Sequence, residues 1–203
     1  MAAASSEPGS VSCDGATQTA IGPGRIVLVV GPSGAGKDAV IRAAREHFVC
    51  DSGVVFPARV VTRPPNSAED HDTLSIAAFE SEAGRGAFAL RWEAHGLLYG
   101  IPRSIDDDAR QGRTVVFNAS RSAVSTARNR YRHVSVVLID ATPELRAARL
   151  AARGREAADE ITARVNRSVS GFSAADANLV IDNSGTVADA VRTLVDWLEA
   201  TPD

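Results

Sequence analysis

The chain has 203 residues, 44% of them hydrophobic, which is enough for one compact domain with a substantial core. A net charge of −3 at pH 7 argues against a general nucleic-acid surface, which would carry a clear basic excess. No run approaches the roughly 18 to 20 apolar residues of a membrane-spanning helix, so we expect neither nucleic acid nor membrane as a partner.

The first 24 residues are rich in Ala, Ser, Gly and Thr and lack the apolar core of a signal peptide. We expect residues 1–24 to form a disordered leader and residues 25–203 a single domain. The two cysteines, Cys13 and Cys50, have no metal-ligand spacing. They favour a reducing cytoplasm over a disulfide framework.

Strand-like and helix-like segments alternate after residue 25, a pattern typical of an α/β fold with a parallel sheet covered by helices. The segments expected to be strands are 26–30, 54–61, 87–92, 114–118, 134–140 and 179–182. The segments expected to be helices are 36–48, 75–83, 104–111, 121–129, 143–153, 157–169 and 186–200. The weaker strand 87–92 could pair with 96–101 in a small antiparallel flap. The polar, proline-broken segment 62–74 is expected to lack regular structure.

A glycine-rich segment follows the first strand and fits the phosphate-binding loop pattern G-x-x-x-x-G-K-[ST] at every position except the last. Its backbone N–H groups and the following helix dipole favour a bound polyphosphate, and its lysine supplies a point charge. A ligand-free turn is the alternative, which the preceding strand, the lysine and the following helical pattern disfavour. The residues expected to bind the nucleotide are Gly31, Pro32, Ser33, Gly34, Ala35, Gly36, Lys37 and Asp38.

Asp38 stands where the pattern has Ser or Thr, whose hydroxyl would bind Mg²⁺. A carboxylate also serves a hard cation but adds a negative charge beside the nucleotide. We therefore predict Asp38 as a magnesium ligand, with its charge offset by Mg²⁺ or by a nearby arginine.

Arginines gather after the strand at 134–140, and a guanidinium matches phosphate oxygens with a fork that keeps its charge. The cluster comprises Arg149, Arg153, Arg155, Arg164 and Arg167, and it predicts a lid over the nucleotide. Arg149 and Arg153 are four residues apart and share one helical face. The alternative is that these arginines pair with Glu144, Glu156 and Glu160 on a solvated helix.

Several other polar residues have two interpretations each. Arg63 is either a substrate-phosphate ligand or a surface arginine before a proline, and Tyr99 either donates to a phosphate or is a satisfied buried aromatic. His71 and His95 are either substrate contacts or ordinary polar residues, and neither has partners at metal spacing.

Four segments together resemble the guanylate kinase group over about residues 25 to 200: the phosphate loop, Thr62-Arg63-Pro64, residues 86–100, and residues 149–154. The resemblance implies a P-loop kinase with a parallel five-stranded core sheet flanked by helices. It also implies a substrate flap at about 62–101 and an arginine lid at about 149–167.

Two departures argue against guanine as the substrate. Guanylate kinases present carboxylates to the guanine edge at positions that match Leu90 and Ser120 here. An apolar residue and a hydroxyl would leave the base without its partners, which is strongly penalised. Asn66 also replaces the second phosphate-binding arginine of that group.

The chain is more closely similar to the ribose 1,5-bisphosphate phosphokinase family of phosphonate breakdown. The similar segments are residues 31–38 with Asp38, 61–64 with 69–71, 92–100, 116–121 and 153–156. The resemblance implies transfer of the ATP γ-phosphoryl group to the 1-phosphate of ribose 1,5-bisphosphate, which gives 5-phosphoribosyl 1-diphosphate. Because the acceptor is an ionised phosphate oxygen, no general base is required.

With ATP and Mg²⁺ as cofactors, the resemblance assigns a role to each candidate. Catalysis would depend on Lys37, Arg149, Arg153 and Arg164, Asn183 would join the nucleotide site, and the substrate would meet Arg63, His95, Tyr99, Asn118, Ser120 and Arg121. Two alternatives stay open: a guanylate-like nucleoside monophosphate kinase, and a non-catalytic peptide-binding module, a class that tends to lose the phosphate loop. A homodimer is compatible with the sequence.

Overall fold

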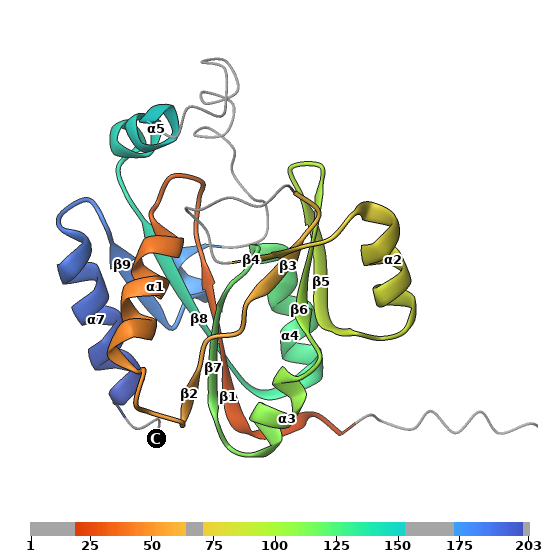
Figure 1. Cartoon of the computed structure of the whole chain (residues 1–203). Coiled ribbons are helices and arrows are strands. Elements are labelled where there is room, and N and C mark those ends of the chain that lie inside the picture. The colour runs from red at the N-terminus through yellow and green to blue at the C-terminus, as the bar shows by residue number, and fades with distance from the viewer. Residues whose placement is uncertain (1–18, 64–70, 153–172, 201–203) are drawn as a thin grey trace, which may run out of the picture.

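Two sheets form the framework of the protein (Figure 1). The structure, a computed structural model, describes residues 19–63, 71–152 and 173–200. Five strands pair in the order β2-β7-β1-β8-β9, and every pairing among them is parallel. They are β1 (Ile21–Val30), β2 (Val54–Val55), β7 (Thr114–Asn118), β8 (Tyr131–Asp140) and β9 (Leu179–Asp182). The predicted five-stranded parallel core sheet is confirmed.

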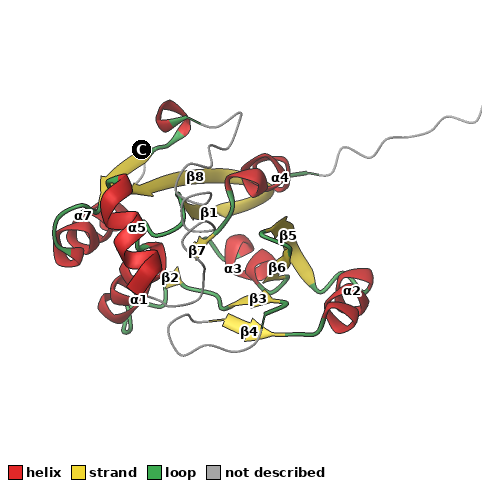
Figure 2. Ribbon diagram, turned by 90° about the horizontal axis from the view of Figure 1, so that it is seen from above, coloured by secondary structure: helices red, strands yellow, loops and turns green. Residues whose placement is uncertain are grey.

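Helices lie on both faces of this sheet (Figure 2). On one face, Val27 and Val29 of β1 join a buried cluster with residues of α1 and α7. On the other face, Ile26 and Leu28 join a cluster with residues of α3 and α4, so β1 is apolar throughout. The helices are α1 (Lys37–His47), α3 (Ile105–Arg110), α4 (Val124–Arg130), α5 (Pro143–Ala152) and α7 (Val187–Glu199), with short 3-10 turns η1 (Arg121–Ala123) and η2 (Ala174–Asp176).

A second sheet, of order β4-β3-β6-β5, stands beside the first. Its strands are β3 (Arg59–Val61), β4 (His71–Thr73), β5 (Phe88–Ala94) and β6 (Leu97–Pro102), and helix α2 (Ile76–Gly84) packs Phe79 on Phe88 with ring centroids 4.5 Å apart. The hairpin β5–β6 is antiparallel and turns at His95 and Gly96, whose φ angles are 56° and 69°. Two successive positive φ values suit the twist of a two-residue hairpin turn. The expected antiparallel flap is thus confirmed.

Two expectations about the segment between the sheets are wrong. The predicted strand 54–61 is divided, because β2 pairs with β7 in the first sheet whereas β3 pairs with β6 in the second. Within 62–74, which was expected to lack regular structure, residues His71–Thr73 form β4 parallel to β3. Strand pairing across sequence therefore overrides the polar composition of this segment. Residues 64–70 lie outside the described residues.

The first strand begins at Ile21, earlier than the predicted start at 26. Ile21 pairs with Tyr131, and a register shift between Ile21 and Arg25 accommodates the Gly-Pro-Gly stretch between them. The expected end of the leader at residue 24 is therefore wrong, because residues 21–24 already belong to β1. Residues 1–18 and the predicted helix at 157–169 lie outside the described residues.

Candidate active site

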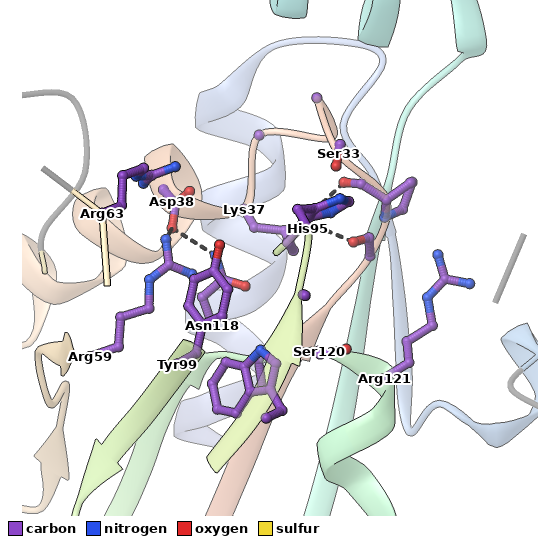
Figure 3. A pocket seen from close by; sticks show the side chains of 17 residues that line it. Ser33, Lys37, Asp38, Arg59, Arg63, His95, Tyr99, Asn118, Ser120 and Arg121 are labelled. Atoms are coloured by element: carbon purple, nitrogen blue, oxygen red, sulfur yellow. Dashed lines mark hydrogen bonds and ion pairs between the residues drawn. The ribbon is translucent and has the colours of Figure 1, made fainter. Parts of the chain in front are cut away.

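A cavity of about 180 Å³ opens at the carboxyl ends of β1 and β7, between the glycine-rich loop and the second sheet (Figure 3). Ligand sites of open α/β sheets lie at this edge, where loops leave the parallel strands. The cavity is lined by Gly31, Pro32, Ser33, Gly34, Gly36, Lys37, Asp38, Arg59, Arg63, Trp92, Ala94, His95, Tyr99, Asn118, Ala119, Ser120 and Arg121. All six residues predicted for the substrate are among them, and so is every predicted loop residue except Ala35, which is buried.

The loop has the backbone shape of a phosphate cradle. Gly36 immediately precedes α1 with φ +90°, and its carbonyl accepts the first helical hydrogen bond from Val40 at 3.1 Å. A Cβ at Gly36 would lie 2.3 Å from Nδ2 of Asn183, so a side chain is excluded here. Gly36 and the first two residues of α1, Lys37 and Asp38, line the cavity, so the N-terminus of this helix lies at the cavity, where the helix dipole favours an anion.

Lys37 is the cation at the centre of the loop. Its Nζ donates to the carbonyl oxygens of Gly31 at 2.8 Å and Pro32 at 2.9 Å. These bonds fold the ammonium over the loop, beside the N-terminus of α1 (Figure 3). A polyphosphate in the cradle would meet this charge directly.

The loop is held from outside the cavity by residues distant in sequence. Asn183 is fully buried, and its Nδ2 donates to the carbonyl oxygen of Ala35 at 2.8 Å. Arg149 donates to the carbonyl oxygen of Asn183 at 3.0 Å and to that of Ala35 at 3.5 Å. Arg146, 8% exposed, donates from Nε to the carbonyl oxygen of Ser33 at 3.1 Å. In this structure Asn183 and Arg149 thus support the loop and do not line the cavity.

The charge of Asp38 is offset by an arginine and an amide. Its Oδ1 accepts a hydrogen bond from Nδ2 of Asn118 at 2.7 Å and forms an ion pair with Nη2 of Arg59 at 3.3 Å. The guanidinium of Arg59 also lies 5.7 Å from the ring centroid of Tyr99. Tyr99 in turn stacks on Trp92, with centroids 5.5 Å apart and an interplanar angle of 3°. The wall facing the loop is therefore aromatic and cationic.

On the side of β7, Ser120 and Arg121 border the cavity. Ser120 caps the N-terminus of η1, and its hydroxyl accepts a hydrogen bond from the N–H of Ser122 at 3.3 Å. Burial lowers the pKa of the Arg121 guanidinium below its ordinary value, and the negative charge of Asp140 opposes this shift. Arg121 still carries its charge at neutral pH, because arginine titrates far above it.

Leu90 does not line the cavity. It is 2% exposed and packs in the apolar cluster that also contains Ile101 and Phe117. Leu90 therefore cannot contact the edge of a base bound in the cavity, which agrees with the expectation that guanine is a poor substrate.

Sequence reasoning missed three residues of this site: Arg59, Trp92 and Arg146. Arg59 could have been found, because residues 59, 61 and 63 of an extended segment share one face, and Arg63 was already a candidate. Arg146 precedes Arg149 by three residues and shares its helical face. Trp92 lay within a segment of the resemblance but received no role, since that role depends on the stacking partner Tyr99 across the hairpin.

Part of the expected lid cannot be placed. Arg153, Arg155, Arg164 and Arg167 lie outside the described residues. Across the chain that the structure describes, no group of three or more His, Cys, Asp or Glu could hold a metal ion by itself. Nor does any helix of the described residues have the length and apolar character needed to cross a membrane.

The fold and the loop define a P-loop kinase of the guanylate kinase class. The family model described as guanylate kinase matches residues 23–201, and the chain belongs to this family. The structure is similar to that of guanylate kinase from Anaplasma phagocytophilum, with a TM-score of 0.66, 18% identity, and coverage of 89% of this chain and 86% of that chain. At this identity the likeness concerns the fold.

Within that family, the chain belongs with the ribose 1,5-bisphosphate phosphokinases. It is 49% identical to ribose 1,5-bisphosphate phosphokinase PhnN of Rhodopseudomonas palustris over 180 residues, which cover 89% of this chain and 91% of the relative. It is 51% identical to the protein of that name from Acidiphilium cryptum, over 80% of this chain and 86% of the relative. The Methylobacterium radiotolerans protein is 46% identical over 88% of this chain and 99% of the relative. The resemblance inferred from the motifs is confirmed.

Proposed function

We propose that the protein transfers the γ-phosphoryl group of ATP to the 1-phosphate of ribose 1,5-bisphosphate, which yields 5-phosphoribosyl 1-diphosphate and ADP. The observation that carries this proposal is the charge of the cavity wall opposite the loop. Arg59 and Arg63 line it, Arg121 adds a positive charge on the side of β7, and the one acidic side chain among the described lining residues, Asp38, is paired with Arg59. Such a wall suits an acceptor with two phosphates, whereas a base edge would require neutral or acidic partners.

The reaction needs positioning and charge stabilisation more than covalent help. An ionised oxygen of the 1-phosphate attacks the γ-phosphorus, a new P–O bond forms, and the bond from that phosphorus to the β-phosphate oxygen breaks, releasing ADP. The helix N-terminus at Gly36 and the ammonium of Lys37 stabilise the negative charge of the donor phosphates. No side chain has to accept a proton.

Magnesium fits this site through one carboxylate. Mg²⁺ in kinases is usually held by one or two carboxylates together with substrate phosphates and water, so a protein cage is unnecessary. Asp38 lines the cavity beside the loop with a side chain that is 24% exposed, and it is the residue that would hold the ion. When bound, the ion would neutralise phosphate charge.

The arginine lid completes the proposal. Arg149 is already fastened to the loop through Ala35 and Asn183, at the last turn of α5. We assign the following arginines, Arg153 and Arg164, to the transferring phosphoryl group, because a second source of positive charge must cover the open side of the loop. On this proposal the reaction takes place in the cytoplasm and acts on small molecules. The proposed assembly is a homodimer, which sedimentation would test.

One observation favours a second candidate. The stacked pair of Trp92 and Tyr99 presents aromatic surface at the cavity, and such surface can stack on a nucleobase. A nucleoside monophosphate kinase therefore has to be tested beside the sugar-phosphate kinase.

The test is a coupled ADP-release assay with ATP and a panel of acceptors, followed by identification of the product. We expect ribose 1,5-bisphosphate to react far faster than GMP or other nucleoside monophosphates, and 5-phosphoribosyl 1-diphosphate to accumulate in step with ADP. A preference for GMP, or ADP release without that product, would overturn the proposal.

A further inference from the structure

Arg59 lines the cavity but has no role in the phosphoryl transfer derived above. It begins β3, and its side chain is only 12% exposed. The guanidinium is oriented from two sides, by the carboxylate of Asp38 at 3.3 Å and by the ring of Tyr99 at 5.7 Å. An arginine held in this way is a pre-organised anion ligand, because little side-chain freedom remains to be lost on binding.

A second, smaller pocket adjoins the cavity at Arg59. This pocket of about 50 Å³ shares Asp38, Arg59 and Asn118 with the cavity and contains none of the residues from Gly31 to Lys37. Two further arginines, Arg42 and Arg45, line it. With Asp38 they follow the spacing i, i+4, i+7 and so share one face of α1. The lining of the smaller pocket therefore contains three arginines and one carboxylate, and its charge is positive.

Arg59 and Arg63 can serve two separate phosphates. They are four residues apart, which in extended chain spans at most about 13 Å, and both line the cavity. In Figure 3 their side chains lie on either side of Asp38. A reacting phosphate must lie against the loop and Lys37, whereas Arg59 also borders the smaller pocket, whose lining shares only Asp38 with the loop.

We propose that Arg59 binds the phosphate of the acceptor that does not react, the 5-phosphate of ribose 1,5-bisphosphate, and that Asp38 and Tyr99 position its guanidinium. This inference rests on the proposed function and assigns the residue that selects a bisphosphate over a monophosphorylated sugar. Arg42 and Arg45 add attraction without direct contact.

The experiment uses ribose 5-phosphate as a probe, because it carries the 5-phosphate but has no phosphate at C1 to receive the γ-phosphoryl group. The variants are Arg59→Gln and Arg59→Lys. The matched control is Arg91→Gln, an exposed arginine of β5 in the same sheet that does not line the cavity. For each protein we would measure kcat, the KM for both substrates, the calorimetric Kd of ribose 5-phosphate, and the thermal midpoint.

We expect Arg59→Gln to raise the KM for ribose 1,5-bisphosphate and the Kd of ribose 5-phosphate by the same factor, about 10- to 100-fold, as for a lost charge-assisted hydrogen bond. The KM for ATP should change less than about twofold, Arg59→Lys should lie in between, and Arg91→Gln should match the wild type.

An unchanged Kd of ribose 5-phosphate in Arg59→Gln would overturn the inference, as would failure of the wild type to bind this probe. A fall in kcat with an unchanged KM for the acceptor would also overturn it, because Arg59 would then act at the reacting phosphate. Equal losses for ATP and the acceptor, with a lower thermal midpoint, would reduce Arg59 to a structural partner of Asp38. A wild type that binds ribose 5-phosphate but does not phosphorylate the bisphosphate would refute the proposed function alone.

Discussion

The side-chain amide of Asn183 donates a 2.8 Å hydrogen bond to the carbonyl oxygen of Ala35, across 148 residues of chain. Asn183 follows β9 at one side of the sheet, whereas Ala35 lies in the loop after β1. The bond therefore ties the loop to a distant strand end. Because both residues are fully buried, losing the bond would leave the carbonyl oxygen of Ala35 without this hydrogen-bond donor and without water to replace it.

Asn183→Ala should weaken ATP binding and stability together. We expect the free energy of unfolding to fall by about 1 to 3 kcal/mol, and the KM for ATP to rise about tenfold as the loop loosens. Urea denaturation and ATP titration measure the two effects. Asn178→Ala is the control: Oδ1 of Asn178 accepts from the N–H of Val136 at 2.8 Å, away from the loop. It should lower stability without changing the KM for ATP. An Asn183→Ala enzyme with normal ATP kinetics would contradict the role assigned to this bond.

Gly36→Ala should disable the phosphate cradle. The residue has φ +90°, and a Cβ there would lie 2.3 Å from Nδ2 of Asn183, so the substitution adds both backbone strain and a clash. We expect kcat/KM for ATP to fall at least about a hundredfold, in line with losing donors to the transferring group. Gly84→Ala is the matched control, because a Cβ at Gly84 meets nothing within 4 Å. It should leave turnover intact. Equal kinetics in the two variants would show that the loop tolerates a side chain.

Lys37→Ala should abolish ATP-dependent turnover. The ammonium is the charge that the loop itself contributes to the phosphates, and removing such a stabilising group costs at least about a hundredfold in rate. The fold should persist, since the hydrogen bonds of Lys37 to Gly31 and Pro32 lie within its own loop. A coupled ADP-release assay measures turnover, and circular dichroism checks folding. Full activity in a folded variant would remove Lys37 from the mechanism.

The buried carboxylate of Asp106 should make stability depend on pH. Burial acts to raise its pKa, but hydrogen bonds from Arg130 and Tyr131 outweigh burial and hold the pKa below the ordinary value of 3.8. A lowered folded-state pKa means that the ion pair stabilises the protein above pH 3.8 and that this stabilisation is lost as the pH falls through the folded-state pKa.

Asp106→Asn should therefore be less stable than the wild type at pH 7, by about 3 kcal/mol as for a broken buried pair, and the gap should narrow below about pH 4. Urea unfolding at several pH values provides the measurement. Asp107→Asn, which removes an exposed pair with Arg110, should cost less than about 1 kcal/mol at any pH. A gap that widens toward low pH would show that the sign of the pKa shift is wrong.

Local patterns predicted those parts of the fold and site that depend on neighbours in sequence. The phosphate loop was identified because one run from Gly31 to Asp38 supplies its cradle and its lysine. The helix α7 was predicted at 186–200, and Thr186 caps its start through a hydroxyl that accepts a hydrogen bond from the N–H of Asp189 at 3.1 Å. Arg63 and Tyr99 were placed at the cavity by motif resemblance, and the structure brings both there.

Partnerships across long stretches of chain were not predictable from the residues alone. The division of 54–61 between two sheets depends on β7 and β6, which are formed much later in the chain. Arg146 and Asn183 support the loop through backbone carbonyls, and such bonds leave no trace in the side-chain pattern. The pairing of Arg59 with Asp38 likewise depends on the tertiary structure, because the two residues belong to β3 and α1.

The sequence by itself determined that this protein holds polyphosphate, because a strand, a glycine-rich turn and a helix N-terminus are contiguous and their chemistry is local. It also showed that Asp38 would need a countercharge, without saying which one. Only the tertiary structure decided that Arg59, 21 residues away, and Asn118, 80 residues away, meet its carboxylate. The physical reason is that an ion pair depends on distance in space, and that distance is set by how the two sheets pack against each other.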